Sequence, residues 1–265
     1  YWHNPTMAKL CAFALEQGIE TEYVRKLIQV HHMTPTGSAL ACSDWPWPVQ
    51  IYTLGRFELL ISGVQAGKPD AAPASKPLQL LKAVIALGGS EVSQEQLADL
   101  LWPDADGDQA RRSFDTTMHR LRKMLGHEQA LTIRNGKLNL DPALVWLDVR
   151  AFDSCFNQLS PVIADSIKPE QVSLYERAIA LYKGGFLPAD KAESWSLDCR
   201  ERLRGRFVRL VVALGSFREQ YQKYEQALEC YRHSLEVDTP SEELYRQLMS
   251  CLAMLDRHAE ALAVY

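Results

Sequence analysis

Residues 108–140 read DQARRSFDTTMHRLRKMLGHEQALTIRNGKLNL, and this stretch decides the fold that we expect. It predicts a basic amphipathic helix, a short loop and a β-hairpin with basic residues near its tip. Between Arg111 and Lys137 there are seven Lys or Arg and two acidic residues, a net charge of +5, whereas the whole chain of 265 residues carries −4. A cationic stretch in an otherwise acidic protein indicates a polyanionic partner, and duplex DNA is the one we expect.

The predicted helix, residues 108–125, has one apolar face and ends at Gly126, because glycine is common just past helix C-termini. Its buried stripe follows a spacing of four, three and four residues: Phe114, Met118, Leu121 and Leu125. A major groove accepts an α-helix, and outward side chains distinguish the base edges. The helix residues that we expect to contact DNA are Arg111, Arg112, Thr116, His119, Arg120, Arg122 and Lys123.

These helix residues divide by the DNA contact that each is expected to make. Arg120 is the leading base-contacting residue, and Thr116 suits a thymine methyl group or a hydrogen bond. His119 and Arg112 reach bases or phosphates. Phosphate contacts, which position a protein without specifying sequence, are expected from the remaining cations: Arg111, Arg122 and Lys123.

The hairpin follows from LTIR and KLNL, which flank Asn135-Gly136, a dipeptide that favours a two-residue hairpin turn. Its tip is expected to lie along a phosphate ridge or to enter the minor groove. The wing residues that we expect to contact DNA are Arg134, Asn135 and Lys137.

The segments before the basic helix predict a small β component and several short helices. Residues 6–33 predict two helices broken near Gly18, and residues 34–48 a Pro-rich linker whose WPWP end alternatively docks on the next domain. Two strands are predicted around Gly55, within residues 49–61, and a mobile loop over residues 63–75. Further predicted elements are helices at 76–87 and 93–101, with Ser93 as N-cap, and a last strand at 145–147.

From residue 148 onward the sequence predicts helices and an internal repeat. Four residues recur at a spacing of 34, the tetratricopeptide period, and Pro240 closes the first copy. The recurring pairs are Tyr224 and His258, Ala227 and Ala261, Leu228 and Leu262, and Tyr231 and Tyr265.

These features together resemble a known family of regulators. A strand pair, three helices and a hairpin after the third helix resemble an OmpR-type winged helix-turn-helix, and MHRLRKMLG, residues 118–126, is similar to the third helix of that fold. Followed by tetratricopeptide-like helices, the arrangement resembles the Streptomyces antibiotic regulatory protein type of activator, whose second half is a bacterial transcriptional activator domain. The motifs IYTLGRFEL, LLWPDADGDQARRSFDTTMHRLRKMLG and WLDVRAFD carry the resemblance, which covers residues 49–265.

The resemblance implies a mainly α fold with a small β component, a winged helix-turn-helix followed by a tetratricopeptide-like α-helical domain. The expected domains are residues 1–33, the end of an upstream helical region; 34–48, the linker; 49–147, the winged helix; and 148–265, the transcriptional activator domain. It also implies promoter DNA, RNA polymerase and a homodimer on repeated sites as partners. Because Thr116, Thr117 and His119 lie on or near the outward helix face, the family's target sequence does not carry over.

Other classes of function find little support in the sequence. No Walker loop, dinucleotide fingerprint or G-x-S-x-G motif is present, so we expect neither an enzyme nor a cofactor. Six scattered cysteines without C-x-x-C spacing predict packed thiols, no metal site and a cytoplasmic location. No apolar run approaches about 18 residues, so no membrane span is expected. The chain lacks an initiator Met and stops within a helical pattern, as expected for part of a longer polypeptide.

Three alternatives remain open at this point. The six carboxylates of residues 91–108 either face RNA polymerase or cap the next helix, and they lack the spacing of a calcium loop. The five arginines of residues 200–209 either bind phosphates or, as we prefer, pair with acids along a long helix. The whole protein is alternatively an interaction scaffold whose repeats bind a partner while the winged helix serves as a docking module.

Overall fold

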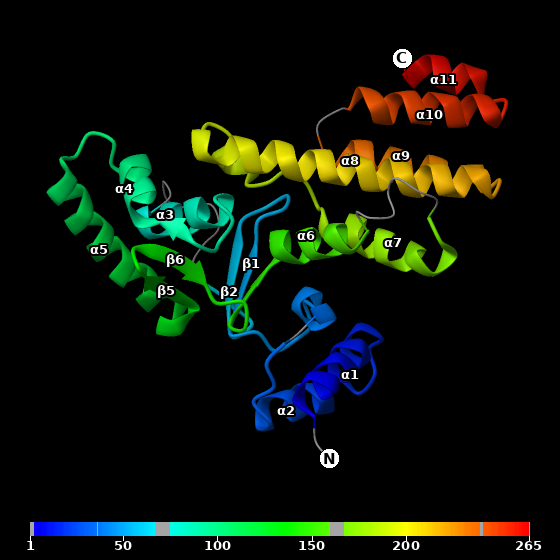
Figure 1. The fold of residues 1–265 in the computed structure, drawn as a ribbon. Helices are drawn as coiled ribbons and strands as arrows, with labels where there is room; N and C mark the ends of the chain where they lie inside the picture. The colour runs from blue at the N-terminus through cyan, green and yellow to red at the C-terminus, as the bar shows by residue number, and fades with distance from the viewer. Residues whose placement is uncertain (1–2, 36, 67–74, 160–166, 239–240, 265) are drawn as a thin grey trace. The chain divides into compact units, whose positions relative to one another are not determined.

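The computed structural model describes residues 3–35, 37–66, 75–159, 167–238 and 241–264, which form two compact units (Figure 1). Unit 1 comprises Tyr1–Tyr52, Phe57–Leu147 and Ala192–Cys199, and unit 2 comprises Thr53–Arg56, Asp148–Lys191 and Arg200–Tyr265. The described residues are mainly helical with a small β component, as predicted. None of the helices among them is both long and apolar enough to cross a membrane.

Unit 1 begins with the predicted helix pair, α1 (Asn4–Glu16) and α2 (Thr21–Val30). The Pro-rich segment that follows is packed rather than solvated, since Trp45 and Trp47 are buried and the Trp47 indole donates to the Cys42 carbonyl at 2.8 Å. The two Trp rings of WPWP are therefore not solvated, and the hydrogen bond of Trp47 is made within the predicted linker itself. Position 36, within the predicted linker, lies outside the described residues.

A four-stranded sheet in unit 1 has the order β3-β2-β1-β7. The predicted strand pair, β1 (Val49–Tyr52) and β2 (Glu58–Ile61), is antiparallel, and the predicted β7 (Val145–Leu147) runs parallel to β1. The prediction of a loop from residue 63 onward is wrong at its start, because β3 (Val64–Gln65) pairs with β2. Most of that predicted loop, residues 67–74, lies outside the described residues.

Three helices and a second sheet complete unit 1. The helices α3 (Lys76–Ala86), α4 (Gln94–Leu101) and α5 (Gly107–Leu125) lie close to their predicted positions. Ser93 caps α4, as predicted, by accepting from the Gln96 amide. The second sheet has the order β4-β6-β5 and consists of β4 (Val92–Ser93), β5 (Leu131–Arg134) and β6 (Lys137–Leu140).

Unit 2 is built from helices, as predicted. Its elements are α6 (Asp148–Leu159), α7 (Val172–Leu181), most of α8 (Leu197–Gln220), α9 (Tyr224–Val237), α10 (Glu242–Met254) and α11 (His258–Val264). Buried aromatic rings join three of these segments, because Phe152 of α6 packs on Tyr182, which stacks on Phe207 of α8 with ring centroids 4.2 Å apart. The Tyr182 hydroxyl donates to the Asp238 carboxylate.

The helices of unit 2 repeat with the same 34-residue period as the sequence. The helices α8 and α10 end 34 residues apart, and α9 and α11 begin 34 residues apart. The turn residues between them, Gln222 and Asp256, are both left-handed, with φ of 58° and 61°. Positions 34 residues apart therefore occupy equivalent places in two helix–turn–helix units. Tyr265 and Pro240, which belong to the predicted repeat, lie outside the described residues.

Within unit 2, Asp148 anchors the segment 53–56 to the start of α6. Its buried carboxylate accepts from the Thr53 amide at 2.5 Å, the Thr53 hydroxyl at 2.7 Å and the Leu54 amide at 2.7 Å. Burial raises the pKa of Asp148, and these hydrogen bonds oppose the rise because they favour the charged form. The carboxylate thereby satisfies backbone donors that would otherwise be buried without a partner.

Two glycines allow the same segment to approach residues 183–187 of unit 2. The Gly55 amide donates to the Gly185 carbonyl at 3.0 Å. A Cβ on Gly55 would lie 2.5 Å from the Lys183 carbonyl oxygen, and a Cβ on Gly184 would lie 2.8 Å from the Gly55 Cα. Gly55 also has a φ of +83°, a conformation that side chains disfavour. Residues 183–187 therefore pack closely against segment 53–56 through their backbones.

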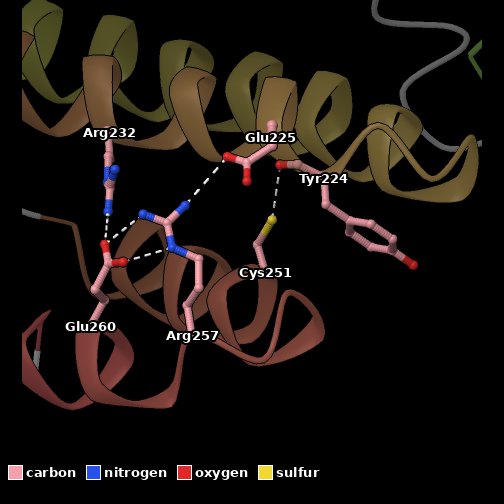
Figure 2. Close-up of polar contacts among 6 residues, drawn as sticks. All are labelled: Tyr224, Glu225, Arg232, Cys251, Arg257 and Glu260. Atoms are coloured by element: carbon pink, nitrogen blue, oxygen red, sulfur yellow. Dashed lines mark hydrogen bonds and ion pairs between the residues drawn. The ribbon is translucent and has the colours of Figure 1, made fainter.

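An ion-pair network holds the last helix of unit 2 to α9 (Figure 2). Glu260 of α11 accepts from Arg257 at 2.7 Å through both carboxylate oxygens and from Arg232 of α9 at 2.7 Å. Arg257 also pairs with Glu225 of α9 at 3.3 Å. Ala261 is the one buried side chain among the described residues of α11, so the network adds polar contacts to a helix with a small apolar face.

We expect Gly55→Ala to lower the free energy of unfolding by about 3 kcal/mol, because a left-handed φ and a backbone clash act together. Gly63→Ala is the matched control, since Gly63 has a φ of +78° but nothing within 4 Å of an added Cβ. It should lose only about 1 kcal/mol, the cost of the conformation. Urea unfolding of the two variants measures the difference, and equal losses would contradict the close approach of the backbones.

We expect α11 to loosen as the pH falls. Arg257 and Arg232 lower the pKa of the Glu260 carboxyl through their hydrogen bonds. The stabilisation is therefore present above the ordinary glutamate pKa of about 4.3 and is lost as the pH falls through the lower folded value. Hydrogen-exchange protection factors of α11 should drop over that range. They should already be low and independent of pH in Glu260→Gln.

Candidate nucleic-acid interface

The orientation of α5 is set by its buried stripe. Phe114, Met118, Leu121 and Leu125 are each at most 2% exposed, as the spacing predicted. The Asp106 carboxylate caps the helix by accepting from the Gln109 amide at 2.8 Å, and Gly126 ends it with a φ of 69°. With one face fixed in the core and both ends defined, the opposite face of the helix is directed away from the core.

That outward face carries most of the predicted DNA-contacting side chains. The exposed ones are Arg111, Arg112, Thr116, His119, Arg120 and Lys123. The Thr116 hydroxyl donates to the Arg112 carbonyl at 2.9 Å, which leaves its oxygen free to accept. The prediction that Thr117 lies on or near the outward face is wrong, because Thr117 is only 6% exposed. Its position, three residues after Phe114 and four before Leu121, turns it toward the core.

Arg122 differs from the other cations of α5. It is half-buried, and its Nε donates to the Leu131 carbonyl of β5 at 3.1 Å. This contact joins the C-terminal half of α5 to the hairpin. The structure thus gives Arg122 a positioning role that the sequence did not indicate, since its acceptor is a main-chain atom nine residues away.

The hairpin forms in the register that its turn dictates. Arg134 lies opposite Lys137, and the turn residues Asn135 and Gly136 have φ of 51° and 72°, the signature of a type I′ turn. Arg134, Asn135 and Lys137 are exposed at the tip. Lys137 pairs with Glu91, and the two charged groups are 3.1 Å apart. The sequence did not single out Glu91, because β4, which brings it there, is only two residues long.

Two clefts lie between α5 and the hairpin. One has a volume of about 550 Å³ and is bounded by the start of α4, the start of α5 with Arg111, and the hairpin tip. The other has a volume of about 650 Å³ and lies at the C-terminal end of α5, where His119, Arg122 and Lys123 face Thr132 of β5. Basic side chains from the helix therefore line both clefts.

Apart from Lys137, which pairs with Glu91, the cations on this surface lack acidic partners among the described residues. Within residues 75–159 and the other described parts of the chain, no carboxylate pairs with Arg111, Arg112, Arg120, Lys123 or Arg134. An exposed, uncompensated group of positive charges attracts polyanions. This is the electrostatic signature that the sequence predicted for DNA.

The arginines of residues 200–209 behave differently. Arg202 and Arg206 both pair with Asp153, and Arg206 also lies over the Phe156 ring. Arg200 donates to main-chain carbonyls, including that of Phe186 at 3.1 Å. The prediction that this run pairs with acids is confirmed for Arg202 and Arg206, but their acid lies on α6 and not along α8, and Arg200 binds main-chain carbonyls instead. These three arginines serve the packing of unit 2.

The remaining candidate sites are also resolved in part. Asp106 caps α5, as the capping alternative for the acidic stretch required. Within the described residues, no three His, Cys, Asp or Glu side chains are placed to hold a metal ion. The six cysteines are free thiols, and five of them are buried, as the packing prediction required. Trp195 is also buried, with its indole donating to Glu193.

Comparisons with known proteins address both units. Residues 147–265 match the model of the bacterial transcriptional activator domain, so this part of the chain resembles a family of transcriptional activators. The structure is similar to that of Mycobacterium tuberculosis EmbR, solved in complex with a low-affinity phosphopeptide, with a TM-score of 0.63 and 17% identity. The match covers 82% of this chain and 58% of that one. No curated protein matches the sequence.

We expect Arg122 and Arg120 to differ in their effect on stability. Arg122→Ala should lower the free energy of unfolding by about 1 kcal/mol, because the Leu131 carbonyl loses its donor. The matched variant Arg120→Ala, in which an exposed arginine is truncated, should change it by less than about 0.5 kcal/mol. Urea unfolding measures both, and equal effects would contradict the positioning role of Arg122.

Proposed function

We propose that this protein is a sequence-specific DNA-binding transcriptional regulator. The observation that carries the proposal is the group of exposed cations on α5 and the hairpin tip that have no acidic partner within the described parts of the chain. A structural surface arginine usually finds a carboxylate or carbonyl, as Arg202 and Arg206 do in unit 2. Uncompensated cations on one helix and an adjacent hairpin instead suit the phosphates of a duplex.

The order of elements supports a winged helix-turn-helix over residues 49–147. The strands β1 and β2 come first, the helices α3, α4 and α5 follow, and the hairpin β5–β6 comes after the third helix. In this proposal α5 is the recognition helix and enters the major groove, while the hairpin is the wing. Residues 1–33 are the end of an upstream helical region, and residues 34–48 connect it to the winged helix.

The side chains of α5 take different roles in the proposed complex. Arg120 contacts a base edge, and Thr116 presents its methyl group and its accepting oxygen to a thymine or a donor. Arg111 and Lys123 contact phosphates. Arg112 and His119 contact either bases or phosphates. Arg122 combines a phosphate contact with its hydrogen bond to Leu131.

The family match of residues 147–265 supports activation as the outcome of binding. We propose that residues 148–265 form a transcriptional activator domain with tetratricopeptide-like repeats, and that the bound protein recruits RNA polymerase, as a homodimer on repeated sites. Such a protein acts in the bacterial cytoplasm, needs no cofactor and catalyses no reaction.

An interaction scaffold is the second candidate. It is favoured by the repeated helical units and by large apolar side chains that they expose, with Met254 at 64% and Leu262 at 76% exposure. In that case the repeats bind a protein partner and the winged helix is a docking module. A docking module does not require the basic outward face of α5, so the DNA-binding proposal accounts for more of the surface.

We expect the protein to bind duplex DNA. The logarithm of the binding constant should fall linearly with the logarithm of the salt concentration, with a slope of about −0.9 per phosphate contacted. Lys123→Ala should reduce the slope by about one unit. Lys9→Ala is the matched control, because Lys9 is an exposed lysine of α1 far from α5 in the sequence, and it should leave the slope unchanged. Fluorescence anisotropy over a salt series measures both.

Absence of binding at low salt would overturn the proposal and favour the scaffold.

The variant Arg120→Ala distinguishes a base contact from a phosphate contact within the proposed function. A bidentate contact to guanine predicts a loss of about 1–3 kcal/mol on the specific site and a relaxed preference at one position. A uniform loss on all duplexes would instead assign Arg120 to a phosphate.

A further inference from the structure

Glu91, the residue before β4, has a backbone conformation that is unusual for its residue type. Its φ is 55°, in the left-handed region that favours glycine and is uncommon for residues with a Cβ. The side chain is nevertheless exposed, so burial of the side chain does not account for this conformation. Such an outlier supports a hypothesis of function when the surroundings hold it in place.

The surroundings of Glu91 do hold it in place. Asn139 of β6 accepts through its Oδ1 from the Glu91 amide at 2.8 Å and from the Ser90 hydroxyl at 2.9 Å. The next residues of the chain pair with the same strand, with Ser93 opposite Lys137. The hairpin thus fixes the backbone of Glu91 from the side of β6.

These backbone contacts place the Glu91 carboxylate beside Lys137, the lysine of the wing. Glu91 Oε2 lies 3.1 Å from Lys137 Nζ, with both side chains more than half exposed. Hydrogen bonds from Lys137 and Asn139 lower the pKa of Glu91, so the group is an anion at neutral pH. Of the ten residues predicted to contact DNA, Lys137 is the one that pairs with a carboxylate within the described parts of the chain.

We propose that Glu91 competes with DNA phosphate for Lys137 and so weakens the binding of the wing to any duplex. The Glu91 carboxylate neutralises part of the positive charge of Lys137 and occupies one of its N–H donors. A phosphate oxygen that approaches Lys137 therefore competes with this carboxylate for the same ammonium. Arg134, which faces Lys137 across the hairpin, has no such competitor among the described residues.

The inference rests on the proposed DNA-binding function and names a residue that tunes it. The contact is with the phosphate backbone, so its effect is independent of base sequence. An exposed ion pair is weak, and its removal is therefore expected to change the affinity by about two- to fivefold. A change of this size alters how readily the protein leaves nonspecific sites without altering which bases it prefers.

A double-mutant cycle on the full chain tests the proposal. The four proteins are the unmodified chain, Glu91→Gln, Lys137→Gln and the double variant, with anisotropy of a random-sequence duplex at low salt as the measurement. Glu91→Gln should bind about two- to fivefold more tightly. The same change in the Lys137→Gln background should have almost no effect, because the contested ammonium is gone.

Glu95→Gln is the matched control, since Glu95 is an exposed acid of α4 that lines the same cleft as Lys137 but has no basic partner within the described residues. An equal gain from Glu95→Gln, or a gain from Glu91→Gln that persists without Lys137, would replace the proposal with a general effect of negative charge. An unchanged affinity in Glu91→Gln would overturn the role of Glu91 and leave the proposed DNA-binding function intact. Absence of DNA binding by the unmodified chain would overturn the proposed function as well.

Discussion

Burial of the apolar stripe of α5 is the constraint on which the candidate interface depends. Four large side chains, from Phe114 to Leu125, occupy the core of unit 1 and fix the rotation of the helix about its axis. Once that rotation is set, the side chains on the opposite face have no access to the core. The positions of Arg112, Thr116, His119 and Lys123 at the surface follow from the packing of residues that themselves touch no ligand.

The arginines of this protein serve two physical purposes, and their partners distinguish them. In unit 2, Arg202, Arg206 and Arg257 meet carboxylates and hold helices together, as Figure 2 shows for Arg257. On α5 the cations remain uncompensated, so their field extends into solvent and is available to a polyanion. At the wing, Glu91 is placed to reduce this attraction, because it pairs with Lys137.

Much of the fold could be predicted because its signals are local. The spacing of α5, the Ser93 cap and the Asn135-Gly136 turn each lie within a few residues, and a 34-residue identity of pattern marks the paired helices of unit 2. The two-residue strands β3 and β4 could not be predicted, because so short a segment carries no periodicity. Thr117 was misplaced because its angle on the helix lies near the border between the two faces.

Local sequence patterns were enough to predict the helices and the longer strands, the concentration of positive charge and the apolar face of α5, since periodicity and composition are properties of the chain. Tertiary structure alone decided which cations are available. Arg122 finds its acceptor on β5, and Lys137 finds Glu91 across a sheet that joins residues more than forty positions apart. The physical reason is that a hydrogen bond or ion pair depends on distance in space, which the order of residues does not state.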